Sequence, residues 1–225
     1  MKSLLSTSII ALLSLSACTT PISQNTNPNA NTNKLATTTT PSSLTFSPNN
    51  YKTITQDDQS LVVRAFENIP YLANPTEPDH QVMNVYIPES YFTGDSINGY
   101  TADTAPIFFP NGVGGYMPAK PMTAESRAGR DGTPRPNSVA AALMRGYVVA
   151  SAGTRGRTLG TDGNHTGKAP SVIVDLKSAI AYLKANNTLM AGRADRIIAN
   201  GTSAGGAMSL LLGASGNSMD YHAEL

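Results

Sequence analysis

Residues 196–213, which read RIIANGTSAGGAMSLLLG, decide the fold. A short apolar run leads into the segment 201–205, Gly-Thr-Ser-Ala-Gly, and a second apolar run follows it. A buried strand, a Gly-x-Ser-x-Gly turn and a helix, in that order, present a serine hydroxyl above the edge of a sheet. The two glycines let the strand and helix backbones approach closely. We therefore predict that Ser203 is an esterase-type nucleophile; the alternative is a structural serine in a packed turn.

The chain before this turn alternates between predicted strands and predicted helices. Apolar runs or alternation indicate strands at 61–66, 81–88, 105–110, 147–152 and 196–200. Helical spacing and capping residues indicate helices at 137–145, 171–186 and from the serine turn to about 213. Strands separated by such helices predict a parallel central sheet covered on both faces. The order is that of an α/β-hydrolase fold, incomplete because the strands that normally follow the nucleophile's helix are absent.

Ester cleavage needs a base for the attacking hydroxyl and N–H donors for the negative charge that develops on the carbonyl oxygen. The residue after the nucleophile supplies one donor at the start of the helix, and here it is Ala204. The second donor is expected in the loop 111–116, NGVGGY, after the strand 105–110. We favour the N–H of Gly115, because the second glycine of a pair can turn its amide towards a ligand without a Cβ clash. The alternative is a glycine-rich connection without catalytic meaning.

Several separate segments resemble the bacterial tannase-like α/β-hydrolases, the subtype B tannases: NGVGGYMP, GYVVASAGTRGRT, GKAPSVIVDLKSAIAYLK, ADRII with NGTSAGGA, and GASGNS. The similarity runs from about Tyr71 to Asn217. It implies hydrolysis of gallate-type esters by a Ser-Asp-His triad, with Ser203 as nucleophile and Gly115 with Ala204 as the oxyanion pair. The acid, the histidine and the galloyl-contacting residues of that family lie in its C-terminal half and have no counterpart here.

Only 22 residues follow Ser203, and the chain closes on MDYHAEL without a final helix or strand. We therefore expect it to be the N-terminal portion of a longer enzyme. Among the three histidines, His222 is poorly placed to reach back to the nucleophile. His165 follows the strand 147–152 in a polar loop, and a surface role there is the alternative to facing the cleft. His80 precedes a strand and is expected to be solvated.

Three further charged residues lie near the predicted site in sequence. Asp175 falls among core positions of the helix 171–186, which favours a cap or a salt bridge over catalysis. Arg155 and Arg157 follow the strand 147–152, close to where a substrate would enter. They either contact a carboxylate or phenol of the substrate or pin their loop to the protein.

The N-terminal end has the pattern of a lipoprotein signal peptide over residues 1–17, with Lys2 followed by an apolar stretch too short to span a bilayer. Small residues directly before Cys18 resemble a bacterial lipobox, so Cys18 is expected to carry lipid; an ordinary secretory signal is the alternative. Residues 18–55, rich in Thr, Asn, Pro and Ser, are expected to form a disordered tether. The protein is then extracytoplasmic and anchored to a membrane, and Thr19 favours the outer membrane of a cell with two.

Residues 56–225 remain for the hydrolase domain, enough for one core. A net charge of +1 without a basic cluster does not indicate a nucleic-acid surface, and the single cysteine allows no intrachain disulfide. The expected partners are a small-molecule ester and, through the lipid, a membrane; no cofactor or metal is expected. The alternatives are another α/β-hydrolase, such as a peptidase or lipase, and a catalytically incomplete lipid-anchored remnant or binding protein.

Overall fold

The computed structural model describes residues 50–56, 58–125, 137–161 and 163–216. The expected signal peptide, Cys18, most of the expected tether and His222 lie outside the described residues. The tether was expected to reach residue 55, but the first strand already begins at Tyr51. This strand, YKTITQ, buries only Ile54, so its composition resembles that of the polar segment before it.

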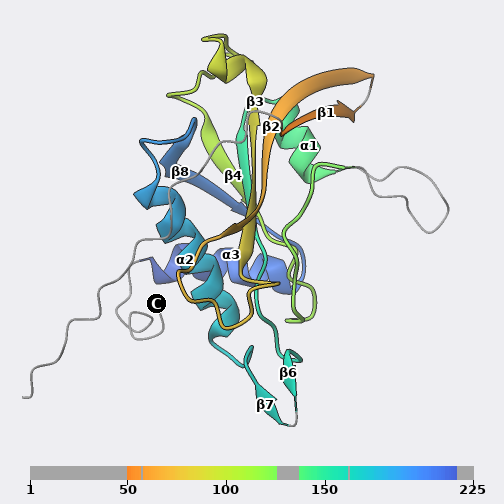
Figure 1. Cartoon of the computed structure of the whole chain (residues 1–225), viewed down its shortest axis with the longest axis vertical. Coiled ribbons are helices and arrows are strands. Elements are labelled where there is room, and N and C mark those ends of the chain that lie inside the picture. Colours follow the sequence, from red (N-terminus) through yellow and green to blue (C-terminus); the bar gives the residue numbers. More distant parts are fainter. Residues whose placement is uncertain (1–49, 57, 126–136, 162, 217–225) are drawn as a thin grey trace, which may run out of the picture. The chain divides into compact units, whose positions relative to one another are not determined.

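Six strands form one mixed sheet in the order β1-β2-β3-β5-β4-β8 (Figure 1). The bounds are β1 Tyr51–Gln56, β2 Gln59–Pro70, β3 Val82–Pro88, β4 Pro106–Pro110, β5 Val148–Ala152 and β8 Arg193–Asn200. β4 pairs in parallel with both β5 and β8, whereas β1, β2 and β3 pair antiparallel with their neighbours. The predicted parallel sheet is therefore right for three strands and wrong for the other three. β1, β2 and β3 follow one another without an intervening helix, and such strands can fold back as hairpins.

The helices are α1 Ser138–Met144, α2 Ser171–Ala185 and α3 Ala204–Ser215, with a short 3-10 helix, η1, at Glu89–Phe92. α1 begins as the sequence predicts, because the side-chain oxygen of Asn137 accepts a hydrogen bond from the N–H of Val139 at 2.9 Å. Two short strands, β6 Gly160–Thr161 and β7 Asn164–His165, form a separate hairpin.

Apolar clusters pack on the two faces of the sheet, and the pleat decides which residue joins which cluster. Met83, Val85 and Ile87 of β3 share a cluster with buried residues of α2 and α3. Tyr86, between them in sequence, belongs to the cluster that contains the buried residues of α1. Helices thus cover both faces of the sheet, as the sequence predicts (Figure 1).

β8 lies at one edge of the described sheet and pairs only with β4 there. Ile198 on this strand is 43% exposed, and Leu210 on α3 is 75% exposed.

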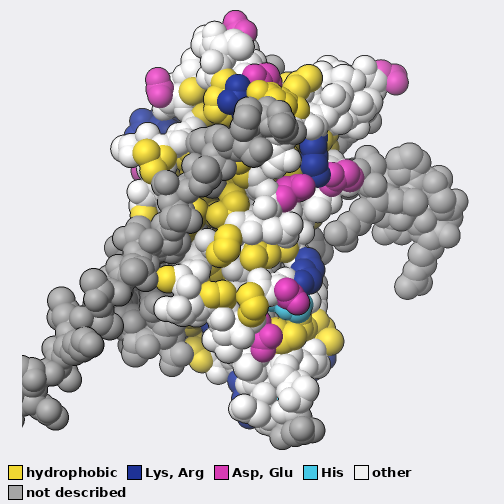
Figure 2. Space-filling model, in the orientation of Figure 1, with side chains coloured by type: hydrophobic (Ala, Val, Ile, Leu, Met, Phe, Trp, Pro, Cys, Tyr) yellow, Lys and Arg dark blue, Asp and Glu magenta, His cyan; other side chains and the backbone are white. Residues whose placement is uncertain are grey.

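On the face of the molecule drawn in Figure 2, basic and acidic side chains are interspersed with hydrophobic ones. Opposite charges are paired in the β2 region, as Arg64 is with Glu89 at 2.7 Å.

Candidate active site

Ser203 lies between the end of β8 and the first residue of α3, in a strained backbone conformation. Its φ is 56° and its ψ is −122°. Non-glycine residues rarely adopt such a positive φ, and a strained residue of this kind costs on the order of 1–3 kcal/mol. The residue is exposed, and its side chain makes no capping hydrogen bond to α3. A serine at a helix N-cap usually does make one. Strain and an exposed, uncapped hydroxyl are the features expected where a strand-to-helix turn presents a nucleophile.

The glycines on either side of Ser203 lie where no side chain fits. A Cβ added to Gly201 would clash with the backbone carbonyl group of Gly205. A Cβ added to Gly205 would lie 2.6 Å from Oδ1 of Asn111 and 3.1 Å from the carbonyl oxygen of Val113. The close approach of strand and helix that the sequence predicts is therefore present, and the loop after β4 packs against the same turn.

Asn111, the first residue after β4, bonds this loop to the serine turn. Its backbone N–H donates to the carbonyl oxygen of Asn200 at 2.9 Å. Its side-chain nitrogen lies 3.0 Å from that oxygen, 3.2 Å from the carbonyl oxygen of Gly205 and 3.0 Å from Oγ of Ser209. The side chain is buried. From the sequence, Asn111 is predicted only as part of a glycine-rich loop; its polar side chain directly after a buried strand is the signal that could identify it.

The predicted oxyanion donor Gly115 lies in a tight turn. The carbonyl oxygen of Gly114 accepts a hydrogen bond from the N–H of Met117 at 3.0 Å. Both central residues have positive φ, +57° at Gly115 and +58° at Tyr116, as in a type I′ turn. Among the hydrogen bonds between described residues, none uses the N–H of Gly115 or of Ala204 as donor. Their pairing as an oxyanion hole stays a prediction.

The far end of this loop lies against the segment 154–157, which follows β5. The N–H of Thr154 donates to the carbonyl oxygen of Ala119 at 2.9 Å, and the N–H of Ala119 donates back at 3.1 Å. The N–H of Arg157 donates to the carbonyl oxygen of Tyr116 at 2.8 Å. A Cβ on Gly156 would clash with the backbone of Met117 and Pro118, so the two segments are in direct contact.

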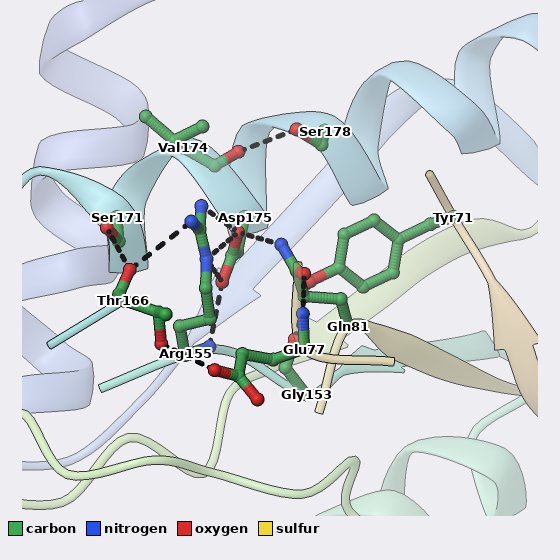
Figure 3. A network of polar contacts seen from close by, with 10 residues as sticks. All are labelled: Tyr71, Glu77, Gln81, Gly153, Arg155, Thr166, Ser171, Val174, Asp175 and Ser178. Atoms are coloured by element: carbon green, nitrogen blue, oxygen red, sulfur yellow. Dashed lines mark hydrogen bonds and ion pairs between the residues drawn. The ribbon is translucent and has the colours of Figure 1, made fainter. Parts of the chain in front are cut away.

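Asp175 forms a buried ion pair with Arg155, as Figure 3 shows. The carboxylate is fully buried, and it accepts the backbone N–H of Arg155 at 2.7 Å and its Nη2 at 2.8 Å. On the other side, Nε2 of Gln81 donates to the same carboxylate at 2.9 Å. The predicted salt-bridge role of Asp175 is confirmed, and Arg155 pins its loop to α2. Arg157 is exposed, and a substrate contact by its side chain stays a prediction.

The two described histidines differ in burial. His165 lies exposed in β7. His80 was expected to be solvated, which is wrong: it is half-buried, and its Nδ1 is buried without a hydrogen-bond partner among the described residues. Burial, with the nearby Lys120 cation, lowers the pKa of His80 below its usual value. Within the described part of the chain, no hydrogen bond joins a histidine to the hydroxyl of Ser203.

No three His, Cys, Asp or Glu side chains in the described ranges gather where they could hold a metal ion. None of the described helices is long and apolar enough to cross a membrane.

Comparison with known proteins shows that the chain is similar to tannases in sequence and fold. Residues 125–225 match the BD-FAE family model. A tannase from Fusobacterium nucleatum is 55% identical, with a TM-score of 0.73, and the match covers 81% of this chain and 38% of that one. A tannase from Lactobacillus plantarum is 42% identical with a TM-score of 0.70, and the match covers 78% of this chain and 37% of that one.

A third similar structure is a tannin acyl hydrolase in complex with ethyl gallate. It is 43% identical with a TM-score of 0.68, and the match covers 78% of this chain and 38% of that one. The chain therefore spans about two fifths of the length of the solved tannases that it matches. A comparison with curated proteins gives no significant match.

Proposed function

Because this chain resembles the N-terminal portion of the bacterial tannase-like α/β-hydrolases, we propose that it supplies the nucleophile half of a serine carboxylester hydrolase. Its substrates are aromatic esters of the gallate type. The observation that carries the proposal is the backbone of Ser203, which is strained between β8 and α3 and leaves the side chain exposed and uncapped. A serine that served only to begin α3 would gain more from a relaxed N-cap with a side-chain hydrogen bond.

In the proposed reaction, Oγ of Ser203 attacks the carbonyl carbon of the ester as its proton passes to a histidine base. The C–O bond to the alcohol then breaks, the alcohol takes up that proton, and an acyl-enzyme remains on Ser203. Water activated by the same base releases the acid. In the tannase-like family that this chain resembles, the base and its acid partner belong to the C-terminal half.

The N–H groups of Ala204 and Gly115 are the proposed donors to the oxyanion. The Ala204 amide is the first of α3, where the helix dipole also favours negative charge. The Gly115 amide lies in the positive-φ turn after β4. Removing one such donor costs on the order of 3–4 kcal/mol of transition-state stabilisation. Both amides lack a hydrogen-bond acceptor among the described residues, which supports the assignment.

The similar structures support the proposed substrate class. One structure of a tannin acyl hydrolase contains ethyl gallate and a second structure contains 3,4-dihydroxybenzoate, each at 43% identity to this chain. Both small molecules are aromatic acids or esters with ring hydroxyl groups. We therefore expect a preference for phenolic acyl groups over short aliphatic ones.

The test uses the polypeptide at the full length that its gene encodes, as wild type and as Ser203→Ala. Wild type is expected to hydrolyse ethyl gallate faster than p-nitrophenyl butyrate. It should also take up one fluorophosphonate group, found by mass spectrometry on the peptide that contains Ser203. Ser203→Ala should lose both properties and keep its thermal unfolding transition. Hydrolysis that survives in Ser203→Ala, or a wild type that cleaves neither ester, would show that the proposal is wrong.

We also propose that the mature protein is extracytoplasmic and anchored through lipid on Cys18, on the basis of the lipobox-like sequence before that residue. Metabolic labelling of the producing cells with a radioactive fatty acid tests this. Wild type should be labelled and recovered with membranes. Cys18→Ser should be unlabelled, and equal labelling of both proteins would contradict the proposal.

A further inference from the structure

Stability alone does not explain the buried ion pair of Asp175 with Arg155, which lies far from the serine turn in sequence. Asp175 is fully buried on α2, and the side chain of Arg155 is only 15% exposed. Transferring two charges out of water is costly, and apolar residues of similar size often stabilise a fold as well or better. The arrangement is nevertheless well satisfied, because the carboxylate also accepts the N–H of Arg155 and the side-chain amide of Gln81.

The ion pair holds a segment that in turn holds the loop after β4. Arg155 lies between Thr154, which is paired with Ala119, and Gly156, which is packed against Met117 and Pro118. Directly beyond them, the N–H of Arg157 bonds to the carbonyl oxygen of Tyr116. A continuous series of hydrogen bonds and packing contacts therefore links Asp175 to Tyr116, the residue after Gly115.

The same loop is fixed at its other end by Asn111, which bonds to Asn200, Gly205 and Ser209 around the serine turn. Between the two anchors lie the turn residues Gly114 to Met117, with Gly115 and Tyr116 at positive φ. The orientation of the Gly115 amide thus depends on two attachments, one to the serine turn and one to the segment held by Asp175.

We propose that Asp175 and Arg155 are positioning residues for ester hydrolysis. Their ion pair fixes the segment 154–157, and through it the loop 116–119, so that the Gly115 amide is held where the oxyanion develops. This inference rests on the proposed function and deepens it. A displacement of about 1 Å in a catalytic group can lower the rate about 100-fold, so a small relaxation of this loop has a measurable effect.

The experiment uses the full-length polypeptide with Asp175→Asn and with the double variant Asp175→Leu/Arg155→Met. The double variant removes both charges, so neither is left buried and unpaired, and the fold is expected to persist. The control is Asp195→Asn, which breaks the exposed ion pair of Asp195 with Arg193 on β8. Each protein is measured for thermal unfolding, for kcat and KM on ethyl gallate, and for hydrogen–deuterium exchange.

Both test variants are expected to lower kcat about 10- to 100-fold with KM within about twofold, because positioning acts on the transition state. Peptides covering 114–121 and 154–158 should exchange faster, while peptides of β3 and β5 remain as protected as in wild type. The control should match wild type throughout. An unchanged kcat in the folded double variant, or faster exchange everywhere, would overturn the inference.

The exchange measurement separates this inference from the proposed function. If wild type cleaves no ester, the proposed function is wrong, and the effect of Asp175 on the loop is still read from the peptides 114–121. If wild type is active and these peptides exchange alike in all variants, only the positioning role is wrong.

Discussion

The side-chain nitrogen of Asn111 lies 3.2 Å from the carbonyl oxygen of Gly205, across a sequence separation of 94 residues. This contact joins the loop that carries one proposed oxyanion donor to the helix turn that carries the other. The same nitrogen also lies 3.0 Å from the hydroxyl oxygen of Ser209, one turn further along α3. The relative position of the two donors thus depends in part on this buried amide.

Asn111→Ala should therefore lower both stability and activity. The substitution leaves buried acceptors without their donor, and each such loss costs about 1–3 kcal/mol. Urea unfolding is the measurement for stability, and kcat on ethyl gallate in the full-length polypeptide is the measurement for activity. Asn164→Ala, at an exposed asparagine of β7, is the control and should change the unfolding free energy by less than about 0.5 kcal/mol. Equal stability of the two variants would contradict the role given to Asn111.

Gly205→Ala should destabilise the fold because its Cβ would press on Oδ1 of Asn111 and on the carbonyl oxygen of Val113. Overpacking of this kind costs about 1–3 kcal/mol. Gly213→Ala, on the same helix, meets nothing within 4 Å and should stabilise the protein by about 0.5–1 kcal/mol. The midpoints of urea unfolding should therefore move in opposite directions. A shift of the same sign in both variants would contradict the close packing at Gly205.

Gly115→Ala tests the effect of the backbone conformation at Gly115, because the added Cβ would meet no steric clash. Its Cβ would meet only a side-chain atom of Met117, at 3.9 Å, but φ is +57° and disfavours any residue with a Cβ. The turn should relax at a cost of about 1 kcal/mol and displace the amide. We expect kcat on ethyl gallate to fall while KM changes little. Gly114→Ala, which has open space and no positive φ, should keep wild-type kcat; a similar loss in both would remove the support for Gly115 as donor.

Tyr91 gives a pH dependence that one substitution can isolate. Burial, with a smaller contribution from Tyr100, raises the pKa of Tyr91 to about 12 from an ordinary value of about 10. The folded state then binds the phenolic proton more tightly than the unfolded state does. The resulting stabilisation is complete below pH 10 and is lost as the pH rises towards 12. Its hydroxyl donates to the carbonyl oxygen of Gly146, in the turn after α1.

Wild type should accordingly lose more of its unfolding free energy than Tyr91→Phe between pH 8 and pH 11, measured by urea unfolding at each pH. Other buried tyrosines titrate in both proteins, so their effect cancels in the difference. Two parallel stability curves would show that Tyr91 does not titrate differently in the folded and unfolded states.

The local features of this protein were determined by the sequence alone. The order of the sheet strands β2, β3, β4, β5 and β8 with the helices α1, α2 and α3, the cap at Asn137 and the tight turn around Ser203 all depend on residues close together in the chain. Apolar periodicity, a capping amide and glycines that permit close approach act over a few residues, so the sequence predicts them. β1 escaped detection because a strand that buries one residue has almost no apolar pattern.

Tertiary structure alone decided which segments meet. Whether β3 pairs parallel or antiparallel with β5, and that Asn111 bonds to Gly205, depend on contacts between residues far apart in sequence. The pairing of Arg155 and Gln81 with the carboxylate of Asp175 is likewise a contact between three separate segments of the chain. A charged or amide side chain has the same local appearance whether it is solvated or buried. Its partner is chosen only when the sheet and α2 pack together, since burial then makes an unpaired polar group costly.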